Sequence, residues 1–176
     1  FVGGNGVTVL TNGNYVVSSS GWDKGNVTNA GAVTFGDGTT GVKGIVSSTN
    51  SLVGSTSNDS VGILGVTALT NGNYVVRSYF WDNGKGAVTF GNGSSGEFGV
   101  VSAANSLVGS TSGDKVGNCN VTVLTNGNYV VSSPDWDNGA ATDAGAVTFG
   151  NGIRGVSGFV SAANSLLGAT SQTLVR

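Results

Sequence analysis

Leu-Thr-Asn-Gly-Asn-Tyr-Val-Val occupies residues 10–17 and returns unchanged at residues 69–76 and 124–131. Two more motifs recur with it: Gly-Ala-Val-Thr-Phe-Gly at 31–36, 86–91 and 145–150, and Asn-Ser-Leu at 50–52, 105–107 and 164–166. A fixed period of this length marks one supersecondary unit that is used repeatedly, each copy packing against its neighbours. The sequence therefore predicts three tandem repeats, at residues 1–59, 60–114 and 115–176.

Each repeat predicts four short strands. In the first copy, residues 7–10 and 14–18 are β-rich runs joined by Thr-Asn-Gly, and Asn-Gly is a strong hairpin signal because both turn residues must tolerate positive φ. The third strand is expected at 32–35, and a fourth apolar piece combines 45–46 with 51–53. Residues 102–107 could form a helical turn, but they lie between glycines and are interpreted as strand and turn.

Four short strands in 55 to 59 residues match the size of a propeller blade. The expected fold class is all-β, with three tandem four-stranded antiparallel blade-like repeats, similar to a β-propeller. The alternative is a β-solenoid of three coils. The Asn-Gly turn argues against it, because that turn implies antiparallel pairing whereas solenoid coils stack in parallel.

One loop varies in length. The middle copy has four fewer residues than the outer copies, and the difference lies between Trp81 and Gly86. Length variation confined to one place marks an exposed loop. The loops that follow Trp22, Trp81 and Trp136 are therefore expected to line one rim.

The expected core consists of Tyr15, Val17, Val33, Phe35, Leu52 and their repeats. The strands contain consecutive apolar residues in place of clean alternation, which suits a sheet covered on both faces. Three blades alone would still leave an apolar first face and an apolar last face open to water.

The repeat resembles an FG-GAP repeat, the blade of integrin-α-type β-propellers. Leu-Val-Gly-Ser at 107–110, Gly-Asp-Lys-Val-Gly at 113–117, Thr-Asn-Gly-Asn at 125–128 and the glycine-flanked strand at 145–150 fall in the order of that family's pattern. The resemblance covers essentially the whole chain and implies a propeller blade. Similar repeats occur in very long bacterial surface proteins of the haemagglutinin-like type.

FG-GAP blades often carry an aspartate-rich loop that binds calcium. At the corresponding turn this sequence has Thr-Asn-Gly-Asn three times, and neutral amides are poor substitutes for the carboxylates that a hard cation prefers. The sequence therefore predicts no cofactor and no metal, with calcium as the one candidate that the resemblance raises.

Composition excludes several function classes. The chain has no histidine, a formal net charge of −2 and seven Lys and Arg residues in total. It therefore offers no Ser-His-Asp arrangement and no imidazole metal site, and it has no basic run to follow nucleic-acid phosphates. No apolar stretch is long enough to span a bilayer. The acidic, Ser/Thr/Asn/Gly-rich composition indicates a secreted or cell-surface location, and Cys119 has no internal disulfide partner.

One aromatic and one acidic residue recur in the rim loops and are the candidate ligand-binding residues. Indole rings beside aspartates resemble the sugar sites of lectin propellers, whereas the structural alternative is one large aromatic per blade that packs against the next. For the aspartates, the structural alternative is capping of backbone amides in the loop. The candidates are Trp22, Asp23, Trp81, Asp82, Trp136 and Asp137.

The preferred functional hypothesis is a structural or adhesive repeat segment of a secreted or cell-surface protein, without enzymatic activity. Three repeats do not close a propeller, so we expect self-association head to tail, as a filament or as a two-chain ring. The alternative hypothesis is a carbohydrate-binding propeller with one shallow glycan site per repeat.

Overall fold

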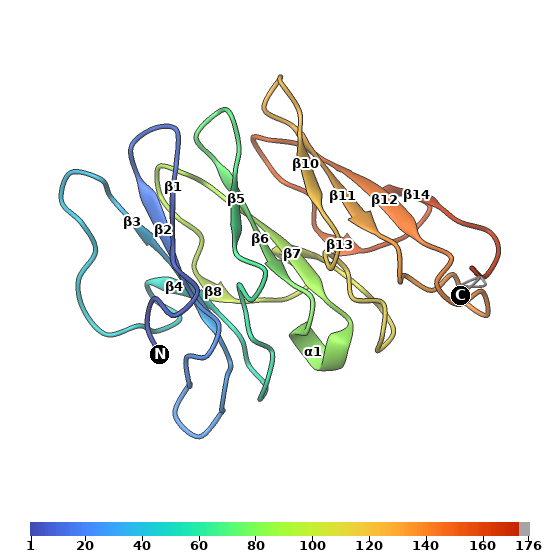
Figure 1. The fold of residues 1–176 in the computed structure, drawn as a ribbon, viewed down its shortest axis with the longest axis horizontal. Coiled ribbons are helices and arrows are strands. Elements are labelled where there is room, and N and C mark those ends of the chain that lie inside the picture. Colours follow the sequence, from blue (N-terminus) through green and yellow to red (C-terminus); the bar gives the residue numbers. More distant parts are fainter. Residues whose placement is uncertain (173–176) are drawn as a thin grey trace.

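The computed structural model describes residues 1–172 as three β-sheets, one for each repeat, which lie in a row along the long axis of the molecule (Figure 1). Strand pairing within each repeat is antiparallel. The expectation of an all-β chain with three four-stranded antiparallel units is therefore confirmed. The sheets form an open row and do not close into a ring (Figure 1).

The strands of the three repeats correspond one to one. The first repeat contains β1 (Val7–Val9), β2 (Tyr15–Ser19), β3 (Ala32–Gly36) and β4 (Ser51–Val53). The second contains β5 (Val66–Ala68), β6 (Tyr74–Ser78), β7 (Ala87–Gly91) and β9 (Ser106–Val108). The third contains β10 (Val121–Val123), β11 (Tyr129–Ser133), β12 (Ala146–Gly150) and β14 (Ser165–Leu167).

The Asn-Gly turns form tight hairpins, as predicted. In the first, the amide of Leu10 donates to the carbonyl of Asn14 over 2.8 Å, and the amide of Gly13 donates to the carbonyl of Leu10 over 3.0 Å. Gly13, Gly72 and Gly127 have φ of +89°, +90° and +84°. Glycine is needed there because a side chain rarely tolerates that conformation. The asparagine before each glycine does not have positive φ, so the expectation that both turn residues adopt it is wrong.

Two short strands cross from one repeat to the preceding sheet, and the sequence interpretation missed them. β8 (Gly99–Val100) pairs in parallel with β4, and β13 (Gly158–Phe159) pairs in parallel with β9. Their counterpart in the first repeat lies at residues 44–45. The sequence predicted one fourth strand that combines 45–46 with 51–53. That assignment is wrong, because residues 51–53 form β4 whereas residues 44–46 lie in no strand of the structure.

The hydrophobic core lies between consecutive sheets. The first cluster joins Leu10, Val16, Val33 and Leu52 of the first repeat, together with Val61, to Tyr74, Val76, Ala87, Val101 and Val108 of the second. The second joins Leu69, Val75, Val88, Leu107 and Val116 to Tyr129, Val131, Trp136, Ala146 and Val160. Each repeat thus packs one apolar face on the following repeat and a different apolar face on the preceding repeat.

The position of a repeat in the row decides whether its expected core residues are buried. Tyr74, Val76, Val88 and Leu107 of the middle repeat are buried, and Phe90 is half-buried. Tyr15 and Val17, on the outer face of the first sheet, are also half-buried. On the last sheet, Val147 is 42% exposed, Phe149 53% and Leu166 77%. The prediction that these three are buried is wrong, because no further sheet covers them.

The shortened loop of the middle repeat contains the only helix among residues 1–172, the single turn α1 (Trp81–Gly84). It is irregular, since Asp82 and Asn83 have positive φ of 46° and 58°. The described part of the chain contains no helix that is both long and apolar enough to cross a membrane.

Candidate functional site

The tryptophans of the rim loops differ in exposure. Trp136 is 5% exposed and belongs to the core cluster between the second and third repeats. Trp81 is half-buried and packs against the first cluster, and Trp22, in the first repeat, is also half-buried. The burial of these indoles does not follow their place in the row, since Trp81 of the middle repeat is more exposed than Trp136 of the last repeat.

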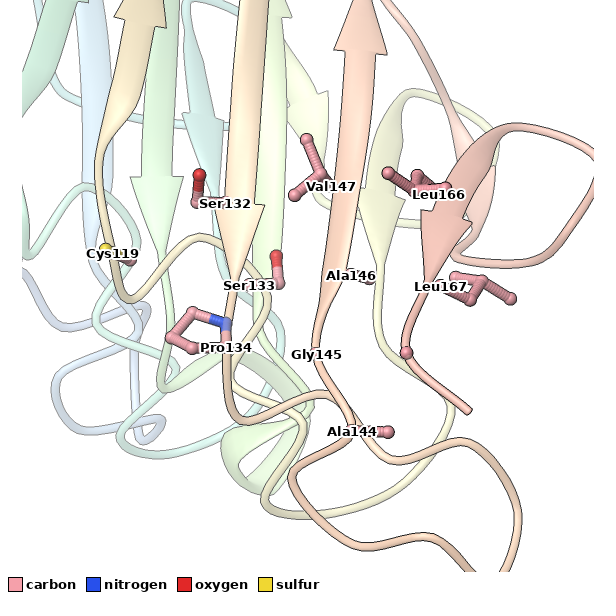
Figure 2. Close-up of a pocket in the computed structure, with 11 residues that line it drawn as sticks. Cys119, Ser132, Ser133, Pro134, Ala144, Gly145, Ala146, Val147, Leu166 and Leu167 are labelled. Carbon is pink, nitrogen blue, oxygen red and sulfur yellow. The ribbon is translucent and has the colours of Figure 1, made fainter. Parts of the chain in front are cut away.

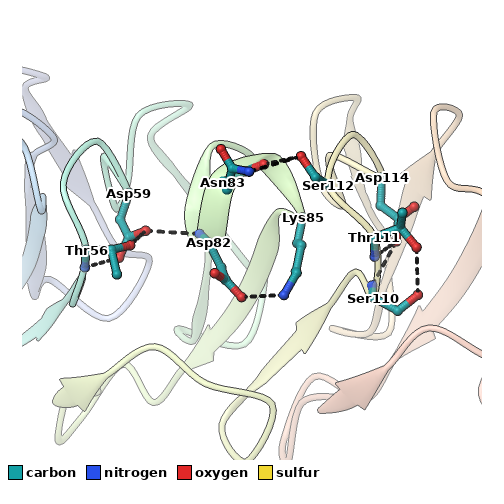
Figure 3. A network of polar contacts seen from close by, with 9 residues as sticks. All are labelled: Thr56, Asp59, Asp82, Asn83, Lys85, Ser110, Thr111, Ser112 and Asp114. Carbon is teal, nitrogen blue, oxygen red and sulfur yellow. Dashed lines mark hydrogen bonds and ion pairs between the residues drawn. The ribbon is translucent and has the colours of Figure 1, made fainter.

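Two buried aspartates, which sequence reasoning did not single out, hold these loops (Figure 3). The carboxylate of Asp59 accepts hydrogen bonds from the amides of Ser55 at 2.8 Å and Thr56 at 2.9 Å, and from the amide of Asp82 in the next repeat at 3.0 Å. The side chain of Asp59 therefore ties the end of one repeat to the rim loop of the following repeat.

Asp114 repeats this arrangement. It accepts from the amides of Ser110 at 2.7 Å and Thr111 at 2.9 Å, and from the amide of Asp137 at 3.2 Å. Both aspartates lie five residues after a glycine, Gly54 or Gly109, and this recurrence was the sequence signal that could have found them. The third repeat has Thr173 at that position, which lies outside the described residues.

The rim aspartates proposed from the sequence make local contacts. Asp23 accepts from the amide of Asn29 at 2.7 Å, and Asp137 accepts from the amide of Asp143 at 2.8 Å. Asp82 instead forms an ion pair with Lys85 at 2.8 Å. Two of the three carboxylates therefore cap backbone amides in their own loops.

A second set of contacts between repeats involves the Thr-Asn-Gly-Asn turns. The Oδ1 atom of Asn14 accepts from the amide of Gly38 at 2.9 Å, while its Nδ2 atom donates to the carbonyl of Gly93 in the next repeat at 2.8 Å. Asn12 donates to the same carbonyl over 2.7 Å. We call this pair of donors the asparagine clasp.

The clasp recurs between the second and third repeats. Asn71 and Asn73 donate to the carbonyl of Gly152 over 2.7 and 2.8 Å. Asn128, at the same place in the third repeat, keeps the bond within its own repeat, accepting from the amide of Gly152 at 2.8 Å. The repeated amides thus have a structural role, and residues 1–172 contain no cluster of three His, Cys, Asp or Glu side chains suited to a metal ion.

Asn73→Asp is expected to destabilise the fold by about 1–3 kcal/mol, because it replaces one of the two donors to the Gly152 carbonyl with a carboxylate, which repels that carbonyl. The new side chain can still accept from the amide of Gly93, which Asn73 contacts at 2.9 Å. Urea unfolding at pH 7 measures the loss.

Asn128→Asp is the matched control, because Asn128 has the same turn and the same bond within its repeat but no following repeat to clasp. At a concentration where the chain is monomeric, we expect a change within about 0.5 kcal/mol. Equal losses in the two variants would contradict the clasp.

A hollow of about 360 Å³ opens on the rim beside α1. Phe80, which is 45% exposed, lines it together with the polar groups of Asn58, Asn83, Ser112 and Lys115. Asn83 and Ser112 are hydrogen-bonded to each other across it (Figure 3). Sequence reasoning did not identify these residues, because Phe80 has no aromatic counterpart in the other two repeats.

A larger hollow of about 460 Å³ lies on the last sheet beside Gly145, Leu166 and Leu167 (Figure 2). In the first two repeats the corresponding glycines, Gly31 and Gly86, form parallel bridges to Val61 and Val116. The third repeat has Val175 at that sequence position, outside the described residues. The hollow therefore corresponds to the place of a core valine.

The fold and its interfaces define a tandem-repeat β-protein in which each sheet packs on the next. The family described as a repeat of unknown function (DUF5650) matches the chain three times, at residues 9–63, 68–118 and 123–176. The chain belongs to this family. No curated protein matches it.

Proposed function

We propose that this chain is a structural or adhesive repeat segment of a secreted or cell-surface protein, without catalytic activity, and that it associates head to tail. One observation carries the proposal: the same interface is built twice within the chain, and its two complementary faces are open at the two ends of the row. On the last sheet Val147, Phe149 and Leu166 are exposed, whereas Val33 and Leu52, the counterparts of Val147 and Leu166, are buried.

Chemical composition supports a structural role. No histidine is present, and Glu97 is the only glutamate in the chain. The buried carboxylates of Asp59 and Asp114 accept hydrogen bonds from backbone amides and so are engaged in holding loops. The acidic, serine- and asparagine-rich composition supports the secreted or cell-surface location.

Kinship with FG-GAP blades is part of the proposal. Four antiparallel strands in each unit and the order of the glycine motifs support it. In an FG-GAP propeller the blades close into a ring, whereas these sheets form an open row (Figure 1). A contact between unlike faces closes only at special angles, so a filament is favoured over a two-chain ring.

Head-to-tail association is tested by light scattering and sedimentation over a concentration series, with electron microscopy of the largest species. We expect the mean mass to rise with concentration and Leu166→Asp to abolish the rise. Ile153→Asp is the control: Ile153 is 75% exposed, and its counterpart in the covered middle sheet, Ser94, is exposed as well. A monodisperse monomer at micromolar concentration would refute the association.

Carbohydrate binding is the second candidate, favoured by the hollow beside Phe80. An exposed aromatic ring with amide, hydroxyl and ammonium groups around it suits the apolar face and the hydroxyls of a sugar. The sugar ring would then stack on Phe80, which is exposed, and not on Trp136, which is buried. Binding on a glycan array that Phe80→Ala removes would support it, and an array without hits would eliminate it.

A further inference from the structure

We infer the register of the contact between copies: residues 44–46 of a second copy add to the open edge of β14 as a parallel strand. The inference rests on the proposed head-to-tail association and specifies its partner surfaces. The occupant of the exposed last face is thus the first sheet of another copy, placed as the second sheet is placed on the first.

Two strands equivalent to β14 already receive a parallel strand in this way inside the chain, β4 from β8 and β9 from β13. In the first sheet Leu52 and Val53 of β4 pair with Gly99 and Val100 of β8, and the amide of Val101 donates to the carbonyl of Val53 over 3.0 Å. The amide of Val160 donates in the same way to the carbonyl of Val108 over 3.0 Å.

β14 has no such neighbour among residues 1–172, since it pairs on one side only, with β12. An unpaired edge is a template for strand addition. The equivalent bond would run from the amide of Val46 in the second copy to the carbonyl of Leu167.

The donor segment already has the required conformation. Gly44 has φ of +110°, close to the +100° of Gly99 and the +95° of Gly158. The Nδ2 atom of Asn50 donates a hydrogen bond to the carbonyl of Ile45 over 3.0 Å. The same bond forms in the other repeats, from Asn105 to Val100 over 3.1 Å and from Asn164 to Phe159 over 2.9 Å. Ile45 is nevertheless 89% exposed. Adding this segment to an edge therefore requires little further ordering.

A phenylalanine packs on a glycine at each internal junction. A Cβ atom added to Gly96 would come within 2.7 Å of the Cβ of Phe35, and one added to Gly155 within 2.5 Å of the Cβ of Phe90. At the open ends the corresponding residues are Phe149 and Gly41. A Cβ at Gly41 would meet only the hydroxyl of Tyr15, at 3.7 Å, so there is room for an incoming ring.

The asparagine clasp extends across the same junction. Asn126 and Asn128 correspond to the clasp donors Asn71 and Asn73, and Gly38 corresponds to the acceptor Gly152. One internal contact has no equivalent, because Thr173 replaces the aspartate that would accept from the amide of Asp23. We therefore expect the junction between copies to be weaker than the junctions within a chain, and its formation to be reversible.

The register is tested by disulfide formation between copies. Adjacent strands lie about 4.8 Å apart, within the Cα separation that a disulfide spans. In a Cys119→Ser background, Ile45→Cys combined with Leu167→Cys places two thiols at the positions that pair as Val53 and Val100 do. Mild oxidation is expected to convert the monomer band into a ladder of dimers and longer species on a non-reducing gel.

Ile45→Cys combined with Ala163→Cys is the control, since Ala163 is exposed but lies off the strand edge. A ladder in the first variant and a monomer band in the control support the register. Association by light scattering with no ladder would overturn the register while leaving the proposed function intact. A monomer by scattering and on the gel would overturn both.

Discussion

Leu107→Ala is expected to lower the free energy of unfolding by about 2–5 kcal/mol, the range for deleting a leucine side chain from a packed core. Leu107 lies on β9, is 0% exposed and belongs to the cluster between the second and third sheets. The cavity would lie against Val88, on the neighbouring strand β7, where the two residues are register partners. Urea unfolding followed by circular dichroism measures the loss.

Leu166→Ala tests whether the loss of stability depends on the burial of the leucine or on its position in the repeat. Leu166 stands at the same position of the repeat and pairs with Val147 as Leu107 pairs with Val88, but it is 77% exposed. At a concentration where the chain is monomeric, we expect a loss of no more than about 0.5 kcal/mol. Equal losses for the two variants would mean that the last sheet is covered in the monomer, which would contradict the open row.

Local chemistry made the hairpins predictable. Glycine tolerates the positive φ of a tight turn, and the flanking β-branched residues favour strands, so Gly13 and its repeats could be placed from the sequence. The strands that cross between repeats could not be placed from the sequence. β8 and β13 are two residues long, too short to show an alternating pattern, and their pairing partner is set by how one repeat sits on another.

The hydrogen bonds between repeats could not be predicted from the sequence either. The turn asparagines were interpreted as turn residues, and they do form the turn, but their Nδ2 groups bind the next repeat. Nothing within one repeat distinguishes Asn73, which clasps a neighbour, from Asn128, which has none among the described residues. The same holds for Leu107 and Leu166: identical motifs acquire different burial only from their place in the row.

Gly86→Ala is expected to cost more than about 4 kcal/mol, which places it among the exceptional single substitutions. Gly86 has φ of +79°, and a Cβ atom there would come within 2.2 Å of the Val116 nitrogen and 2.6 Å of the Val116 oxygen. Both contacts are with backbone, so no side chain can rotate away. The substitution must displace the segment that carries Val116, a fully buried residue of the core between the second and third repeats.

Gly65→Ala isolates the conformational part of that cost. Gly65 has φ of +76°, nearly the value of Gly86, but nothing lies within 4 Å of an added Cβ. Placing alanine in the left-handed region costs about 1–2 kcal/mol, so thermal and urea unfolding should show a modest loss for Gly65→Ala and a far larger one for Gly86→Ala. The difference measures the close approach of the two backbones at the parallel bridge between Gly86 and Val116. Comparable losses in the two variants would show that the chain reaches a relaxed arrangement at this junction, and that the stacking of repeats does not depend on glycine there.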